Sequence, residues 1–205
     1  MNINEGYYIK LHLKLKLAVL TDHSVYIQNL KNGEIGAFDQ LIDDYQNKVY
    51  NTILSIVQQE QDAEDLTQEV FIQIFTSIRK FRGDAKLSTW IYKISVMKSL
   101  EFLRKKRAKK RLYFFKNLIG IQSIENQITD FSHPGIELIN KEKAIQLFSA
   151  LRKLPENQRV AFTLIKIEGL SYQEVGEIMN KSVKSIEGLT IRAKEHLKII
   201  LKQYE

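Results

Sequence analysis

Apolar residues in the first half of the chain recur at steps of three and four, the period of an α-helix with one buried face. We expect a first helix with the apolar stripe Phe38, Leu41, Ile42, Tyr45, Val49 and Ile53. We expect a second from Ala63 to Ile78, with the stripe Leu66, Val70, Phe71, Ile74 and Ile78. Asp62 stands where its carboxylate can cap the amino end of that second helix.

A loop is expected from Phe81 to Thr89, because this segment contains Gly83 and polar turn formers. A third helix should begin near Thr89 and end in a run of basic residues. In the second half, a helix that carries Phe148 and Leu151 should stop before Pro155, because proline clashes with a preceding helical turn. The next helix carries the stripe Val160, Leu164 and Ile167 and should stop at Gly169.

Ser171 and Glu174 have the spacing of a capping box, which predicts a new helix start at this point. The helix from Tyr172 to Met179 is only two turns long, and Asn180-Lys181-Ser182 separates it from a last helix. The inward stripe of that last helix is Ile186, Leu189, Ala193, Leu197 and Ile200. Two helices joined by so short a turn favour a helix-turn-helix.

The chain is expected to be all-α, with two small helical domains joined by a flexible linker and the helix-turn-helix in the second. We place the first domain at 24–110, the linker at 111–136 and the second domain at 137–205. The linker shows no sustained period and contains Gly120, Pro134 and Gly135. Residues 1–23 alternate apolar and basic positions without a partner strand nearby, so they are treated as an appendage of unknown role.

Composition narrows the classes of function. The 205 residues include no cysteine, so disulfides, thiolate metal sites and cysteine nucleophiles are excluded. The four histidines are scattered and no glycine loop could cradle a phosphate, so we expect no enzyme, no metal and no cofactor. No apolar run approaches the roughly 20 residues of a membrane span, and basic residues interrupt the amino-terminal leucines, so we expect a cytoplasmic protein without a signal peptide.

The net charge of +7 is concentrated in one place. Seven basic residues account for it: Arg104, Lys105, Lys106, Arg107, Lys109, Lys110 and Arg111. With Trp90, Tyr92, Phe102 and Phe81 nearby, this run is typical of a nucleic-acid surface on which cations neutralise phosphates and rings stack on bases. The alternative is that the cations only complement the helix dipole, and Trp90 by itself is more typical of a core residue.

The carboxy-terminal helix pair could bind DNA. Gly176 lets the turn approach the first helix closely, and Asn180 tolerates a left-handed turn. The start of the last helix carries groups that can grip phosphates or base edges, namely Lys181, Ser182, Lys184, Ser185, Glu187 and Arg192. An ordinary helical hairpin remains the alternative.

An acidic stretch, QEQDAEDLTQEVF, precedes the basic run and contains no basic residue. Its charged side chains are Glu60, Asp62, Glu64, Asp65 and Glu69. Its sign makes it an unsuitable DNA surface, so it is either a solvated helix face or a protein-docking surface.

Three segments together resemble the extracytoplasmic-function sigma factors of bacterial RNA polymerase. They are DAEDLTQEVF (62–71), FRGDAKLSTWIYKIS (81–95) and LPENQRVAFTLIKIEGLSYQEVGEIMNKSVKSI (154–186), in the order and spacing of that family. The resemblance implies a non-catalytic subunit that brings core polymerase to promoters and helps to open them, with a sigma region 2 domain followed by a region 4 domain.

The resemblance implies site residues on three surfaces. Docking on the polymerase core is implied for Asp62, Glu64, Asp65, Gln68 and Glu69. Recognition and melting of the minus-ten element are implied for Phe81, Lys93, Met97, Lys98, Arg104, Lys105 and Arg107. Reading of the minus-thirty-five element is implied for Lys181, Ser182, Lys184, Ser185, Glu187, Gly188 and Arg192.

Two residues depart from the family pattern. Met97 stands where an asparagine is usual in a pocket for a flipped base, and Glu187 occupies a position that is often basic. The expected partners are core RNA polymerase, promoter DNA and an anti-sigma factor, with no membrane insertion and no small-molecule substrate. The alternative function is a free-standing helix-turn-helix regulator that acts without stable association with polymerase.

Overall fold

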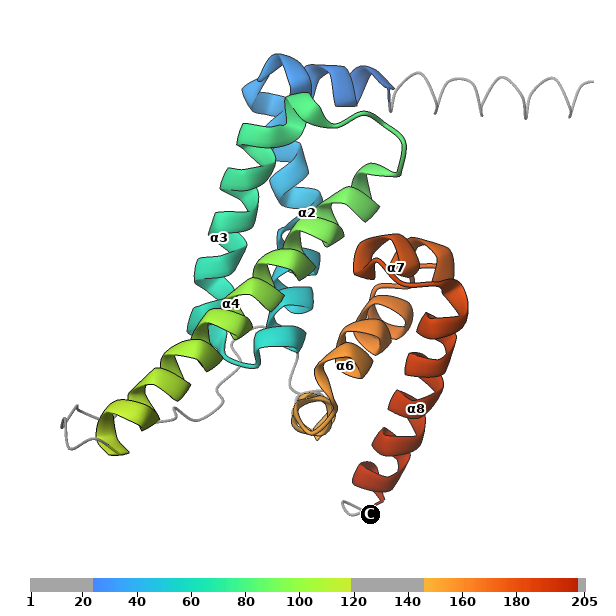
Figure 1. The fold of residues 1–205 in the computed structure, drawn as a ribbon. Helices are drawn as coiled ribbons and strands as arrows, with labels where there is room; N and C mark the ends of the chain where they lie inside the picture. The colour runs from blue at the N-terminus through green and yellow to red at the C-terminus, as the bar shows by residue number, and fades with distance from the viewer. Residues whose placement is uncertain (1–23, 119–145, 203–205) are drawn as a thin grey trace, which may run out of the picture.

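The computed structural model describes residues 24–118 and 146–202, and within these ranges all regular structure is helical. The first unit contains a helix over 24–32, α2 (Ile35–Val57), α3 (Glu60–Ser77), the short η1 (Ile78–Lys80) and α4 (Leu87–Leu118) (Figure 1). The second contains a helix over 146–152, α6 (Glu156–Phe162), η2 (Thr163–Ile167), α7 (Tyr172–Met179) and α8 (Val183–Leu201). The expected all-α class with two helical units is confirmed.

The apolar stripes of α2, α3 and α4 form the core of the first unit. Leu41, Ile53, Val70, Ile74 and Ile91 are all fully buried there. Burial of each such side chain contributes about 1.5–3 kcal/mol to folding, so the stripes bring the three helices together. Ile42, expected to face inward, is instead 37% exposed, because it lies at the edge of the stripe beside Leu41.

The expected cap of α3 was wrong. The residue before the helix is Gln59, which makes no side-chain capping bond, and Asp62 lies inside the first turn. A carboxylate is still favoured there by the helix dipole. Its Oδ2 lies 2.7 Å from Lys106 Nζ on α4, so Asp62 ties α3 to α4 rather than capping α3.

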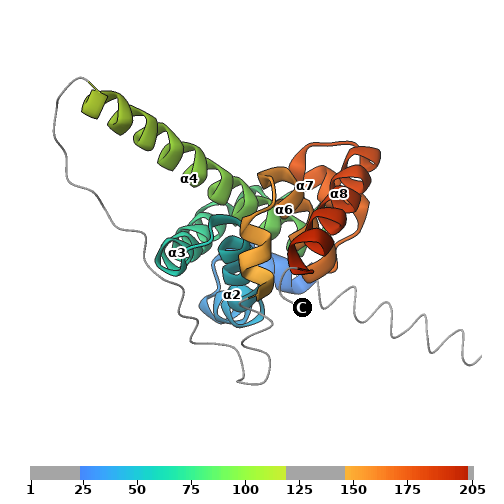
Figure 2. The same cartoon turned by 90° about the horizontal axis from the view of Figure 1, so that it is seen from below.

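Helix α4 begins at Leu87 and continues to Leu118, beyond the boundary expected at residue 110. Arginine, lysine, alanine and leucine, which dominate residues 103–112, are good helix formers, so the backbone has no reason to stop in the basic run. Figure 2 shows the last turns of α4 running away from the other helices. The remainder of the expected linker and residues 1–23 lie outside the described residues.

The chain between α6 and α7 makes a π-helical turn, η2. The Glu168 amide donates to the Thr163 carbonyl at 3.0 Å, and Gly169 then turns the chain with a φ of +70°. The helix thus ends at Gly169 as expected, although Ile167 is 41% exposed rather than inward. A π-helical turn changes the direction in which the following side chains point, and the residue that directly follows this turn is Glu168.

The two units pack against each other, which the sequence did not predict. One apolar cluster contains Ile56, Tyr92 and Val96 from α2 and α4 together with residues of the second unit. The buried residues that the second unit contributes are Val160, Ala161, Leu164, Ile165, Val175, Ile178 and Ile186. Figure 1 shows α6, α7 and α8 lying together on one side of the first unit.

Candidate nucleic-acid and protein interfaces

The helix-turn-helix forms as expected from its capping and turn residues. Ser171 Oγ accepts the Glu174 amide at 3.2 Å, and the Glu174 carboxylate accepts the Ser171 amide at 2.9 Å, which completes the capping box. Asn180 adopts the left-handed conformation with a φ of +53°. A Cβ on Gly176 would lie 2.8 Å from the Lys181 carbonyl oxygen, so only glycine allows the turn to fold back this closely.

The start of α8 presents the expected DNA-reading groups to solvent. Ser182 caps the helix by accepting the Ser185 amide at 3.3 Å. The exposed side chains of this set are Lys181, Ser182, Lys184, Ser185, Glu187 and Arg192. Gly188 is half-buried, and its missing Cβ leaves room for the Arg192 guanidinium, 3.4 Å from the position that a Cβ would take.

The loop between η1 and α4 borders a cavity. The rings of Phe81 and Trp90 pack with centroids 5.3 Å apart, and Phe81 is only 5% exposed. Both residues and Lys93 line a cavity of about 260 Å³ whose wall also includes Glu177 from α7. Trp90 thus packs against the core of the first unit, as expected.

The candidate minus-ten residues of α4 divide into two groups. Lys93, Met97 and Arg104 are exposed, and Met97 is 57% accessible. Lys98 instead pairs with Glu69 on α3 at 2.8 Å. Lys105 pairs with Glu101 one turn earlier at 2.8 Å, and Arg107 pairs with Glu156 of the second unit. The Lys105–Glu101 pair lowers the pKa of Glu101 and raises that of Lys105.

The acidic residues of α3 also divide. Asp62 and Glu69 pair with lysines of α4, and Glu64, Asp65, Glu69 and the amide Gln68 are exposed. The sequence reasoning missed two apolar residues farther along α3. Ile72 is 63% exposed and Phe75 is 58% exposed. Their exposure could have been predicted from the sequence, because neither residue belongs to the inward stripe of this helix.

Comparison with known proteins assigns the chain to a family. Residues 41–109 match Sigma-70 region 2, and residues 144–197 match Sigma-70, region 4. The ECF RNA polymerase sigma-E factor of Haemophilus influenzae is 32% identical over 181 residues, which cover 86% of this chain and 93% of the relative. The chain belongs to the extracytoplasmic-function sigma factors. It therefore confers promoter specificity on bacterial RNA polymerase in transcription initiation.

Two further relatives of the chain are also sigma factors. The ECF sigma-E factor of Escherichia coli K12 is 30% identical, with 86% of this chain and 92% of the relative covered. The sigma-H factor of Pseudomonas aeruginosa is 28% identical, with 82% and 88% covered. Matches to both regions in one chain do not favour the alternative of a free-standing regulator.

Solved structures share the fold. CnrH, in complex with the cytosolic domain of CnrY, superposes with a TM-score of 0.66 at 20% identity, covering 89% of this chain and 99% of that one. The sigma factor RpoE of Bartonella quintana, in complex with the anti-sigma factor NepR, gives a TM-score of 0.62 at 22% identity, covering 82% and 98%.

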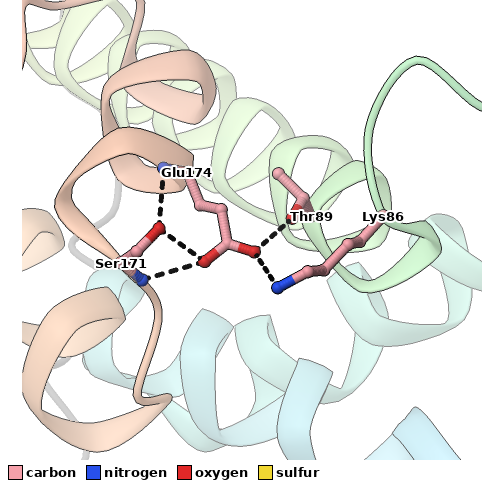
Figure 3. A network of polar contacts seen from close by, with 4 residues as sticks. All are labelled: Lys86, Thr89, Ser171 and Glu174. Carbon is pink, nitrogen blue, oxygen red and sulfur yellow. Dashed lines mark hydrogen bonds and ion pairs between the residues drawn. The ribbon is translucent and has the colours of Figure 1, made fainter.

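Two groups at the contact between the units, one carboxylate and one phenol, have shifted pKa values in this sigma factor. Hydrogen bonds from Lys86 and Ser171 lower the pKa of Glu174 to about 2. Burial and a hydrogen bond to Glu168 raise the pKa of the Tyr92 hydroxyl. The Lys86–Glu174 ion pair (Figure 3) and the Tyr92–Glu168 hydrogen bond each join the first unit to the second. Among the described residues, no acidic and histidine cluster suited to a metal ion is found, and no helix is long and apolar enough to cross a membrane.

Proposed function

We propose that this sigma factor acts through three separate surfaces: α3 docks on core polymerase, the loop before α4 together with α4 reads and melts the minus-ten element, and α8 reads the minus-thirty-five element. The observation that carries the proposal is the segregation of exposed charge. Exposed carboxylates lie on α3 and on the neighbouring α2, whereas exposed cations gather on α4 and at the start of α8. Surfaces of opposite sign suit a protein partner and DNA respectively.

The docking surface combines charge with apolar area. Glu64, Asp65 and Gln68 give it a polar rim, and Ile72 and Phe75 give it an exposed apolar part. Phe75 packs on Phe38 of α2 with ring centroids 4.7 Å apart, so its ring is held in place before a partner arrives. Asp62 and Glu69 support the surface by fixing α3 to α4. This composition is that of a protein interface with a desolvated centre.

The minus-ten surface lies on the loop and on α4. Lys93, Arg104 and Arg107 offer cations to phosphates, with Lys98 and Lys105 beside them. The cavity beside Phe81 and Trp90 provides a place for an unstacked base. Met97 is exposed between Lys93 and Arg104, where it can pack against a base but offers no amide for paired hydrogen bonds.

The minus-thirty-five surface is the amino-terminal half of α8. Lys181, Ser182, Lys184 and Ser185 surround the positive end of the helix, where phosphate binding is favoured. One turn farther along, Glu187 can accept from a cytosine amino group, and Arg192 lies beside Gly188. The acidic Glu187 gives this protein its own base preference within the family.

The protein works by binding rather than catalysis, and the nucleotide chemistry belongs to the polymerase. Capture of unstacked bases offsets a few kcal/mol of unstacking during promoter opening. We place this activity in the cytoplasm, with no cofactor. An anti-sigma factor is proposed as a regulatory partner, because the similar Bartonella RpoE was solved in complex with one.

Charge reversal on α3 tests the docking assignment. Asp65→Lys should weaken the binding of fluorescently labelled full-length chain to core RNA polymerase about tenfold, because it removes an attractive charge and adds a repulsive one. The matched control is Asp39→Lys, which makes the same change at an exposed position on α2. Anisotropy titrations with core enzyme would give both affinities. Equal affinities for the two variants would contradict the assignment of α3.

A further inference from the structure

The second half of α4 carries a run of cations that the minus-ten surface uses only in part. The basic residues of this run are Arg104, Lys105, Lys106, Arg107, Lys109, Lys110 and Arg111. The side chains of residues 104–112, which we call the distal part of α4, are all exposed. The match to Sigma-70 region 2 ends at residue 109, whereas the helix continues to Leu118. The last cations therefore lie at and beyond the end of the part that the family shares.

Carboxylates of the protein neutralise only the first part of this run. Lys105, Lys106 and Arg107 each form an ion pair with a carboxylate, on α4, α3 and α6 respectively. Among the described residues, no carboxylate pairs with Lys110 or Arg111. The cations at 109, 110 and 111 each follow another cation by four residues, a spacing at which like charges repel on a helix. A polyanion bound along the distal part of α4 would relieve this repulsion.

The helix dipole does not explain the last cations. Its effect on charged side chains is confined to the final turn of a helix. Arg111 lies seven residues before Leu118, about two turns from the end of α4. A role in complementing the dipole therefore does not account for the charges at 109, 110 and 111.

The cations of the distal part of α4 surround a groove. Its volume is about 680 Å³, and the described residues that line it are Arg104, Lys105, Arg107, Ala108, Lys110 and Arg111. All of these except Ala108 are cations. Figure 2 shows that this end of α4 runs away from the other helices, so a large partner can reach it.

The composition of this surface fits duplex DNA better than a protein or an unpaired strand. Protein interfaces have an apolar centre, and among residues 104–112 only Ala108 and Leu112 are apolar. Unpaired bases are held by stacking on aromatic rings, and the same residues include no aromatic side chain. Cations without rings bind phosphates, which are alike at every base pair.

The place of this surface on α4 selects the part of the promoter that it meets. Lys93 belongs to the proposed minus-ten surface, and Arg111 lies 18 residues farther along the same helix. At ~1.5 Å per residue this separation is about 27 Å, the length of roughly 8 base pairs of duplex. A helix held at the minus-ten element by one half therefore places its other half beside the flanking DNA. The flanking duplex that must also reach α8 is the spacer between the two promoter elements.

We propose that the distal part of α4 is a further DNA-binding site, which holds the phosphates of the spacer duplex directly upstream of the minus-ten element. The proposal rests on the proposed function, because the minus-ten surface fixes where α4 lies on the promoter. Contacts of this kind carry no sequence preference. They add affinity that falls with salt, by a slope of about 0.9 per phosphate on duplex DNA.

Two promoter fragments test the site with core polymerase that carries the full-length chain. Both come from a promoter at which this polymerase initiates transcription in vitro, and both have a premelted minus-ten element and a fluorescent label. The long fragment keeps the spacer duplex without the minus-thirty-five element, and the short fragment ends at the upstream edge of the minus-ten element. Anisotropy titrations give the affinity for each fragment from about 0.1 M to about 1 M salt, the range over which phosphate contacts weaken.

Removal of two cations from the groove makes the test quantitative. The distal variant combines Lys110→Gln with Arg111→Gln. Its matched control combines Lys198→Gln with Arg152→Gln, both at exposed positions of the second unit. On the long fragment, loss of two phosphate contacts should lower the slope of log affinity against log salt by about 1.8, which weakens binding roughly 60-fold at about 0.1 M salt. On the short fragment the distal variant should bind like the control.

Three results would overturn the proposal. Equal slopes for the distal variant and the control on the long fragment would show that no phosphate is bound there. The same loss on both fragments would place the contact on the minus-ten element rather than on the spacer. A weaker affinity of the distal variant for core polymerase would show that the surface binds the polymerase. Circular dichroism verifies that the helices of each variant are intact.

The proposed minus-ten surface is tested separately by Lys93→Gln, which should weaken binding to both fragments relative to Lys198→Gln. If Lys93→Gln binds both fragments as well as that control does, the assignment of the minus-ten surface fails. If Lys93→Gln weakens both fragments while the distal variant matches its control on the long one, only the spacer contact fails.

Discussion

At the scale of single residues, Glu174 shows how one carboxylate can serve local and tertiary structure together. Its two oxygens accept from the Ser171 amide, the Ser171 hydroxyl, Lys86 and Thr89. A carboxylate with this many donors strongly favours its ionised form. The capping box was visible in the sequence, but the bond to Lys86 joins residues 88 positions apart and leaves no local signal.

Stability should depend on pH through Glu174. Its pKa in the folded chain is about 2, below the ordinary value of 4.5, so the ionised group stabilises the fold above about pH 4.5. This contribution is lost progressively as the pH falls from 4.5 toward 2. We expect Glu174→Gln to flatten the fall in unfolding free energy across this window, as measured by urea unfolding at a series of pH values.

The matched control for this experiment is Glu187→Gln, an exposed position on α8. An identical dependence on pH in the wild type and in Glu174→Gln would show that the hydrogen bonds of Glu174 contribute nothing to stability. A flattened dependence in both variants would show that the effect is not specific to this carboxylate.

At the scale of elements, the helix-turn-helix depends on one close approach. Gly176→Ala would place a Cβ 2.8 Å from the Lys181 carbonyl oxygen, so either α7 or the turn has to move. We expect a loss of about 1–3 kcal/mol in unfolding free energy, in the range of overpacked sites. Gly36→Ala is the control, since a Cβ there meets nothing within 4 Å in α2 and should stabilise by about 0.5–1 kcal/mol.

Chemical denaturation of the two glycine variants would measure both effects. If Gly176→Ala were as stable as the wild type, the turn would be more adaptable than its geometry indicates. The comparison is informative because both changes add one methyl group to a helical glycine, and only the surroundings differ.

Elements with a local cause were predictable from the sequence. The stripes of α2 and α3, the capping box of α7 and the left-handed Asn180 each depend on residues within a few positions of one another. The predictions that were wrong depended on contacts with distant residues or on the helix propensity of the basic run. Asp62 was expected to cap α3 but bonds to Lys106, and α4 continues through a basic run that was expected to end it.

The candidate site was predictable to a similar extent. Residue type and order indicated the acidic face of α3, the basic run and the recognition helix. Periodicity could not show that Lys98 and Lys106 are paired with α3, which leaves Lys93 and Arg104 as more accessible cations. It also could not show which helices meet, since Tyr92 and Glu168 are 76 positions apart in the chain.

At the scale of the whole molecule, the two units share a buried cluster and should unfold together. Val96 is 1% exposed and contacts the second unit, so the native contact adds to the stability of both units. We expect free wild-type protein to show one calorimetric transition whose van't Hoff and calorimetric enthalpies agree, as for a single cooperative domain.

Val96→Asp should separate that transition into two. A carboxylate at this position would be buried without a partner while the two units are in contact, but it would be solvated once they separate. The substitution therefore destabilises the contact between the units more than the folding of either unit. The exposed neighbour Met97→Asp is the control, because it introduces the same charge one residue away at a side chain that is 57% accessible. Two transitions in the wild type would contradict the cooperativity expected from the shared cluster. A single transition retained in Val96→Asp would show that the contact contributes too little to couple the units.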